Sequence, residues 1–213
     1  MKFSKLLQVI ADEPVFASAL LLAGDIEPGD VRRQLSRWVQ SGRLYQLRRG
    51  LYALAPPYQK IKPHPFLVAN QLVHGSYVSL QSALAYYGLI PEYVPLTTSV
   101  AAHRPGTWHT PLGDYDFRHI QPTLLAGYQR YAVSPSQSAF VATPEKALFD
   151  LAYLYPNADS PAYVRELRLQ NLDQLNLDRL HQWVKVFASP KLARFANQVA
   201  ALAQSESIEY EIL

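Results

Sequence analysis

Residues 28–54 read PGDVRRQLSRWVQSGRLYQLRRGLYAL, and this stretch decides the fold of the N-terminal part of the chain. Its first half has apolar residues at three- and four-residue spacing, which is typical of a helix with one buried face. Pro28 suits the first turn of a helix, and Gly42 is the glycine that commonly follows the last turn. The pattern therefore predicts a helix over residues 28–40.

This helix is expected to have two contrasting faces. At about 100° per residue, its apolar side chains share one side of the helical wheel and form a core face: Val31, Leu35, Trp38 and Val39. The opposite side carries polar side chains with no acid among them: Arg32, Arg33, Ser36, Arg37 and Gln40. Such side chains donate hydrogen bonds to phosphates and to the edges of guanine and adenine. We predict that this face binds double-stranded operator DNA.

The second half of the stretch predicts a β-hairpin. Apolar and polar residues alternate over residues 43–48 and again over residues 51–54, with Arg49-Gly50 as the turn. Arg43, Arg48 and Arg49 make the hairpin basic, and the last two lie at its tip. A basic hairpin in this position follows a phosphate backbone or enters the minor groove. These three arginines complete the predicted DNA-binding set.

The preceding residues predict two short helices, over residues 3–11 and 15–23, separated from the basic helix by Gly24-Asp25 and by Ile26 as a buried turn residue. Three helices followed by a basic hairpin are the order of a winged helix-turn-helix domain. In such a domain the second helix of the helix-turn-helix motif enters the major groove. The alternative is a winged helix that serves only protein contacts.

Charge and composition agree with a nucleic-acid binder but do not require one. The 213 residues have a formal net charge of +3, yet six arginines and one aspartate lie between Pro28 and Gly50. A solvated basic face explains the charge alone equally well. The absence of cysteine excludes disulfides, thiolate metal sites and a cysteine nucleophile. The apolar runs near the N-terminus are too short for a signal peptide or a membrane span, so we expect a cytoplasmic protein with no membrane partner.

Three stretches of the chain resemble the AbiEi-type antitoxins, which are transcriptional regulators of phage-defence systems. They are SGRLYQLRRGLY at residues 41–52, YVSLQSALAYYGLIP at residues 77–91 and ATPEKALFDL at residues 142–151. The resemblance implies an N-terminal DNA-binding domain that represses its own operon. It also implies a C-terminal domain that counteracts a cognate toxin of nucleotidyltransferase type.

The remaining sequence predicts a mixed α+β domain with a helical tail. Prolines at 56–57 and 63–65 predict a boundary, which divides the chain into a winged helix-turn-helix domain at residues 1–58 and an α+β interaction domain at residues 59–213. Helices are expected over residues 65–74, 79–88, 161–170, 176–188 and 190–204, and another begins at Thr143-Pro144-Glu145. Strands are expected over residues 97–102, 107–109, 114–120, 128–133 and 138–142.

We expect no enzyme and no cofactor. The acid-and-lysine set Asp114, Asp116, Glu145 and Lys146 resembles that of metal-dependent nucleases, which keeps a defence-associated nuclease as an alternative. Its spacing fits a strand edge and a capped helix turn better. His103, His109 and His119 are interpreted as surface or packing residues rather than metal ligands. Ser79, Ser82 and Ser138 lie in no nucleophile elbow.

Three further features leave alternatives open. The tyrosines of the second domain suit an interface or an ordinary core equally well: Tyr77, Tyr86, Tyr87, Tyr93, Tyr115, Tyr128 and Tyr131. Arg104, Arg118 and Arg130 extend the basic surface or meet an acidic partner. Pseudo-palindromic operators favour pairing of two copies on DNA, although no heptad pattern for a coiled-coil dimer is present. A DNA-binding regulator without antitoxin activity is a further alternative.

Overall fold

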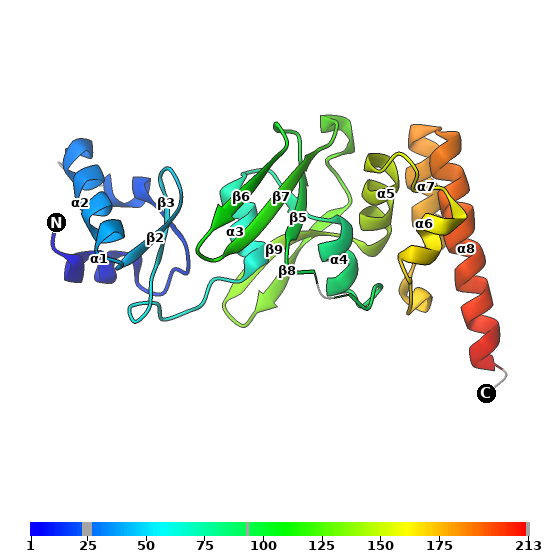
Figure 1. Ribbon diagram of the computed structural model, residues 1–213, viewed down its shortest axis with the longest axis horizontal. Helices are drawn as coiled ribbons and strands as arrows, with labels where there is room; N and C mark the ends of the chain where they lie inside the picture. Colours follow the sequence, from blue (N-terminus) through cyan, green and yellow to red (C-terminus); the bar gives the residue numbers. More distant parts are fainter. Residues whose placement is uncertain (23–26, 93, 212–213) are drawn as a thin grey trace.

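The computed structural model describes residues 1–22, 27–92 and 94–211. Three parts follow one another along the longest axis of the molecule (Figure 1): an N-terminal unit, a six-stranded sheet with its helices, and a helical tail. The fold is a mixed arrangement of helices and strands, so the α+β prediction is confirmed. No helix in the described part of the chain is long and apolar enough to span a bilayer.

The N-terminal unit contains α1 (Phe3–Ile10), β1 (Phe16–Ala17), the 3-10 helix η1 (Ser18–Leu22), α2 (Pro28–Gln40), β2 (Leu44–Arg48) and β3 (Leu51–Leu54). Its three strands form an antiparallel sheet in the order β1-β3-β2. The buried faces of α1 and α2 pack on this sheet through Leu6, Ile10, Leu35 and Trp38. The expected helix over residues 28–40 and the expected hairpin are both present.

The prediction of a helix over residues 15–23 is wrong. Phe16 and Ala17 form a strand that pairs with Tyr52 and Leu51 of β3, and only the 3-10 helix η1 follows. The strand depends on partners 34 and 36 residues further along the chain, which the local apolar spacing cannot reveal. The predicted turn at Gly24-Asp25 and Ile26 lies outside the described residues.

The second part is built on a six-stranded mixed sheet in the order β6-β7-β5-β4-β9-β8. The strands are β4 (Tyr77–Val78), β5 (Thr97–Ala101), β6 (Gly106–Thr110), β7 (Gly113–His119), β8 (Tyr128–Ser134) and β9 (Gln137–Ala142). The helices beside the sheet are α3 (Pro65–Leu72), α4 (Leu80–Tyr86), the 3-10 helix η2 (Pro122–Leu124) and α5 (Pro144–Leu154). Five of these strands match the expected ranges within two residues, whereas the two-residue strand β4 was not predicted.

The tail contains α6 (Pro161–Glu166), the 3-10 helix η3 (Leu172–Gln174), α7 (Leu177–Phe187) and α8 (Pro190–Glu211). In Figure 1 these helices pack beside α5, on the side of the sheet away from the N-terminal unit. Glu206 of α8 accepts hydrogen bonds from the backbone N–H groups of Asn171 and Leu172, at 3.0 and 2.9 Å. The long last helix is thereby fixed to the start of η3.

Two clusters of buried apolar side chains underlie this arrangement. One lies inside the N-terminal unit, between α1, α2 and its sheet. The other fills the second part, and it also includes Leu47, Leu51 and Ala53 from the hairpin. The hairpin therefore contributes one face to each core, which joins the N-terminal unit to the rest of the molecule.

Candidate nucleic-acid interface

The basic helix α2 begins and ends where the sequence predicts. Pro28 occupies its first turn, where the missing N–H costs no hydrogen bond. At its other end, Arg43 N–H donates to the Trp38 carbonyl at 2.9 Å and Gly42 N–H to the Val39 carbonyl at 3.0 Å. Gly42 has a φ of 68°, in the left-handed region that favours glycine, so the pair of bonds is a Schellman motif. The motif turns the chain directly into β2.

The two faces of α2 are separated as the helical wheel requires. Val31, Leu35 and Trp38 are buried against the sheet of the N-terminal unit. The five polar side chains of the predicted face are all exposed: Arg32, Arg33, Ser36, Arg37 and Gln40. Arg33 forms an exposed ion pair with Asp30, one turn earlier on the same helix. Solvent screens such a pair strongly, so a phosphate can replace the Asp30 carboxylate at small cost.

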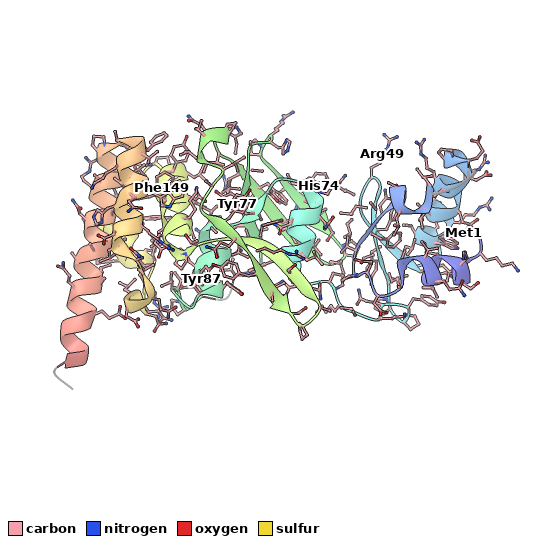
Figure 2. All side chains as sticks on the ribbon, turned by 180° about the vertical axis from the view of Figure 1, so that it is seen from behind. Met1, Arg49, His74, Tyr77, Tyr87 and Phe149 are labelled. Carbon is pink, nitrogen blue, oxygen red and sulfur yellow. The ribbon has the colours of Figure 1, made fainter. Side chains whose placement is uncertain are left out.

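The hairpin turn presents Arg49 to solvent. Gly50 has a φ of 81°, and its carbonyl accepts a hydrogen bond of 2.8 Å from Ser18 N–H, which ties the turn to the start of η1. Arg49 is exposed, and its side chain points away from the body of the molecule at the tip of the hairpin (Figure 2). A cation in this position can reach a DNA backbone without any rearrangement of the fold.

The structure places the other two hairpin arginines in contacts within the protein. The Arg43 guanidinium lies 5.2 Å above the ring of Phe3, a cation–π contact at the start of α1. Arg48 donates to the Gln71 carbonyl at 3.3 Å, and its buried Nε has no hydrogen-bond partner among the described residues. Arg48 therefore joins the hairpin to α3, whereas Arg49 is the exposed member of the hairpin set and Arg43 and Arg48 are half-buried.

The sequence reasoning missed a buried ionic cluster in the second part. Lys146 and Asp150, one turn apart on α5, form an ion pair with no exposed side-chain surface. The second carboxylate oxygen of Asp150 accepts hydrogen bonds from Ser79 Oγ at 2.8 Å and from Tyr77 OH at 3.0 Å. The i, i+4 spacing of lysine and aspartate in PEKALFDL is the signal that could have revealed the pair.

Aromatic rings enclose this cluster. The Lys146 ammonium lies 5.0 Å from the ring centres of Phe149 and Trp183 and 5.6 Å from that of Tyr77. Burial lowers the pKa of Lys146 and raises that of Asp150, while their mutual attraction opposes both shifts. Burial and the Asp150 charge raise the pKa of Tyr77 far above its ordinary value. Tyr77 and Phe149 lie where the sheet meets the helices (Figure 2), so the cluster supports the fold.

The nuclease-like residues do not form one site. Asp114 pairs with His109 at 2.8 Å and Asp116 with Arg118 at 2.7 Å, both on the exposed β6–β7 hairpin. Glu145 is buried and accepts a hydrogen bond of 2.9 Å from Asn176 N–H, and Lys146 points into the core. Within the described ranges, no three histidine or acidic residues are arranged to hold a metal ion.

The remaining residues considered from the sequence have ordinary structural roles. His103 and His119 are exposed, and the hydroxyl groups of Ser82 and Ser138 hydrogen-bond within the sheet and α4. Of the tyrosines, Tyr77, Tyr87, Tyr115 and Tyr131 belong to the core or pack on it, while Tyr86 and Tyr128 remain 40% and 37% exposed; Tyr93 lies outside the described residues. Arg104, Arg118 and Arg130 are exposed on the sheet and its loops.

A comparison with protein families finds a match for the segment that contains the candidate interface. Residues 26–55 match the sequence model of a family of transcriptional regulators. More narrowly, the family is described as "Transcriptional regulator, AbiEi antitoxin", so the resemblance seen in the sequence is confirmed for this segment. The matched segment contains α2 and the hairpin β2–β3, which carry all eight residues of the predicted DNA-binding set. A search of curated proteins finds no match to the chain.

Proposed function

We propose that this protein is a transcriptional repressor that binds operator DNA through an N-terminal winged helix and acts as an antitoxin through its second domain. The observation that carries the proposal is the exposed face of α2, which consists of three arginines, a serine and a glutamine with no acidic or apolar side chain among them. The order of α1, η1, α2 and the hairpin supports a winged helix, as does the family match.

The two groups of side chains have different roles in this proposal. Arg32, Arg33, Ser36, Arg37 and Gln40 enter the major groove, where arginine reads guanine and glutamine reads adenine. Arg49 contacts a phosphate or the minor groove from the hairpin tip. Arg43 and Arg48 approach the backbone only if they leave Phe3 and Gln71, so we expect them to contribute less.

The proposal divides the chain into a DNA-binding domain at residues 1–58 and an interaction domain at residues 59–213. An apolar cluster formed only by residues of the first part supports this division, although one face of the hairpin packs into the second part. The second domain counteracts a nucleotidyltransferase-like toxin, and the first represses the operon that encodes the protein itself. Two copies pair on a pseudo-palindromic operator.

Fluorescence anisotropy of the full chain on its own upstream DNA and on scrambled DNA, at two salt concentrations, tests operator binding. We expect tight binding to the upstream sequence and a steep decrease in affinity with salt, because phosphate contacts release counterions. Equal, weak binding to both DNAs would show that the basic face is only a nonspecific or solvated surface.

Variants separate base reading from phosphate contact. Arg33→Ala should weaken operator binding by about 1–3 kcal/mol and relax sequence preference if Arg33 reads a base. Arg49→Ala should weaken binding to all DNA sequences alike. It should also reduce the slope of log affinity against log salt concentration by about one. Arg194→Ala is the matched control, because Arg194 pairs with Asp159 in the tail. Normal binding by both of the first two variants would contradict the assignment.

Growth rescue tests the antitoxin activity. The full chain and its Arg33→Ala/Arg37→Ala variant are each co-expressed with the toxin encoded beside it. If the second domain neutralises the toxin, both proteins should restore growth. Rescue by the wild type alone would make neutralisation depend on DNA binding. Rescue by neither would leave a DNA-binding regulator without an antitoxin role.

A further inference from the structure

A cavity of about 920 Å³ opens on the sheet beside the segment that follows the hairpin. We call it the linker cavity, and its walls are residues 62–66, the end of α4, residues 90–92 and 94–95, the turn at 111–114, and Ser134 with Gln137. Its volume lies in the range of small-molecule sites, roughly 300–1,000 Å³. Most of its apolar lining comes from Phe66, Tyr86, Ile90, Leu112 and several prolines.

The linker that forms one wall is held in place by a single buried side chain. Gln137 Oε1 accepts a hydrogen bond of 2.7 Å from His64 N–H, and Gln137 Nε2 donates to the Lys62 carbonyl at 3.0 Å. Gln137 is 7% exposed, and its partner in the β8–β9 ladder is Ser134. Lys62, His64 and Ser134 all line the cavity.

Lys62 and His64 supply hydrogen-bond donors. Lys62 is exposed, and its ammonium has no ion pair or hydrogen bond within the described part of the chain. The Phe66 N–H donates to His64 Nδ1 at 3.2 Å, so a neutral His64 carries its proton on Nε2, which can donate. Burial lowers the pKa of His64, which favours this neutral form. The buried Oγ of Ser134 has no partner among the described residues.

Two acids that line the cavity, Asp114 and Glu92, have hydrogen-bond partners of their own. Asp114 lies 2.8 Å from His109 Nδ1, and Glu92 accepts a hydrogen bond of 3.2 Å from Arg168. The cavity is thus lined by one cation, Lys62, without a partner among the described residues, and by two carboxylates, Glu92 and Asp114, that repel further negative charge. A ligand with one negative charge balances Lys62, whereas a dianion such as a phosphate monoester leaves an excess negative charge near Asp114 and Glu92.

From this arrangement we propose that the linker cavity binds a small amphipathic carboxylate. The carboxylate accepts hydrogen bonds from Lys62 and His64, and the aliphatic or aromatic body lies against Phe66, Tyr86 and Leu112. Phe66 and Tyr86 have ring centres 5.7 Å apart and form a continuous apolar surface for it. This site is separate from the exposed face of α2, so the proposal does not rest on operator binding.

Fluorescence titration of the full chain with anilinonaphthalene sulfonate, an aromatic monoanion, tests the site. We expect one binding site per chain and about tenfold weaker binding for Lys62→Met, because a charge-assisted hydrogen bond is lost. Lys60→Met is the matched control, because Lys60 lies on the same linker but pairs with Asp12 at 2.9 Å. Both lysines are exposed, and thermal melts of the variants should coincide with that of the wild type.

Competition identifies the chemistry of the ligand. Decanoate should displace the probe, while decanol, which lacks the charge, and decyl phosphate, which carries more of it, should do so at least several-fold less well. Equal binding of the probe by Lys60→Met and Lys62→Met would overturn the proposal. Displacement by decanol as effective as that by decanoate would also overturn it, since the cavity would then be only an apolar surface.

Discussion

The N-terminal unit and the sheet domain differ in where they place positive charge: it is exposed on α2 and buried on α5. On α2, Arg32, Arg33 and Arg37 are exposed to solvent, and the one ion pair that they form with a described residue, Arg33 with Asp30, is exposed on both sides. On α5, Lys146 and Asp150 form a pair of the same kind with no exposed surface at all. Both pairs join side chains three or four residues apart on one helix.

The difference lies in what surrounds each pair. Water screens the Arg33 charge, so its cost to the fold is small and its field reaches a ligand. The rings of Tyr77, Phe149 and Trp183 remove water from Lys146, so its charge is tolerated only because Asp150 compensates it. Exposed cations are therefore available for binding, whereas the buried one is committed to the fold.

The largest expected effect comes from breaking the buried pair. Asp150→Ala leaves the Lys146 ammonium buried without a partner and should lower the free energy of unfolding by about 3–5 kcal/mol, as measured by urea denaturation. Asp30→Ala removes the partner in the exposed pair and should cost less than about 1 kcal/mol. Equal costs for the two variants would show that burial does not distinguish the pairs.

A smaller effect is expected at Gly127, which closes the aromatic cage around Lys146. Its φ is 75°, and a Cβ there would lie 2.4 Å from Trp183 and 3.0 Å from Lys146. Gly127→Ala should destabilise the protein by about 1–3 kcal/mol, because the cage has no room for the methyl group. Gly75→Ala is the control with a φ of 77° and open space around it. Thermal or urea unfolding measures the loss of stability. An equal loss for both variants would mean that backbone strain alone, and not the crowded cage, causes it.

Next in size is a pH effect at His64, where the two parts of the molecule join. Burial lowers its pKa below the ordinary value of 6.5, so the unfolded chain binds this proton more readily than the folded chain. The free energy of unfolding should therefore fall as the pH decreases below about 6.5 and be insensitive to this group above it. Urea denaturation at pH 5.5 and 7.5 measures the slope.

Two variants test whether His64 causes this pH dependence of the free energy of unfolding. His64→Asn should reduce it, because asparagine accepts the Phe66 N–H at the start of α3 without titrating. His74→Asn is the control for the substitution itself, since His74 is exposed. A slope that persists in His64→Asn belongs to other groups.

The smallest effect on stability is expected on the basic face itself. Arg32→Ala should change the free energy of unfolding by no more than about 0.5 kcal/mol, because the side chain is exposed and has no ion pair among the described residues. Its operator affinity should nevertheless fall in the anisotropy measurement. A large loss of stability together with the loss of binding would place Arg32 with the structural cations.

The sequence predicted those parts of the site that depend on neighbours along the chain. The bounds of α2 follow from Pro28 and Gly42, and its exposed face follows from the spacing of Val31, Leu35 and Trp38. Thr143 caps α5 as expected, with its side chain accepting from Lys146 N–H at 3.3 Å. Each of these features involves residues within one or two helical turns, so the local pattern contains the necessary information.

The features that the sequence did not predict depend on distant partners. β1 requires β3, and Arg48 lies against Gln71, 23 residues further on. The Asp150 carboxylate meets hydroxyl groups from Tyr77 and Ser79, more than 70 residues earlier. Periodicity and charge count give no information on such encounters, because they arise only when separate elements pack together.

The sequence by itself therefore determined a basic helix with one apolar face, a basic hairpin and a mixed α+β remainder. Only the tertiary structure decided which charges of the hairpin and of the second domain face solvent. It leaves Arg49 free at the hairpin tip, ties Arg48 to α3 and buries Lys146 beside Asp150. The physical reason is that the energy of a charge depends on how much water its surroundings exclude, and elements far apart in the chain create those surroundings.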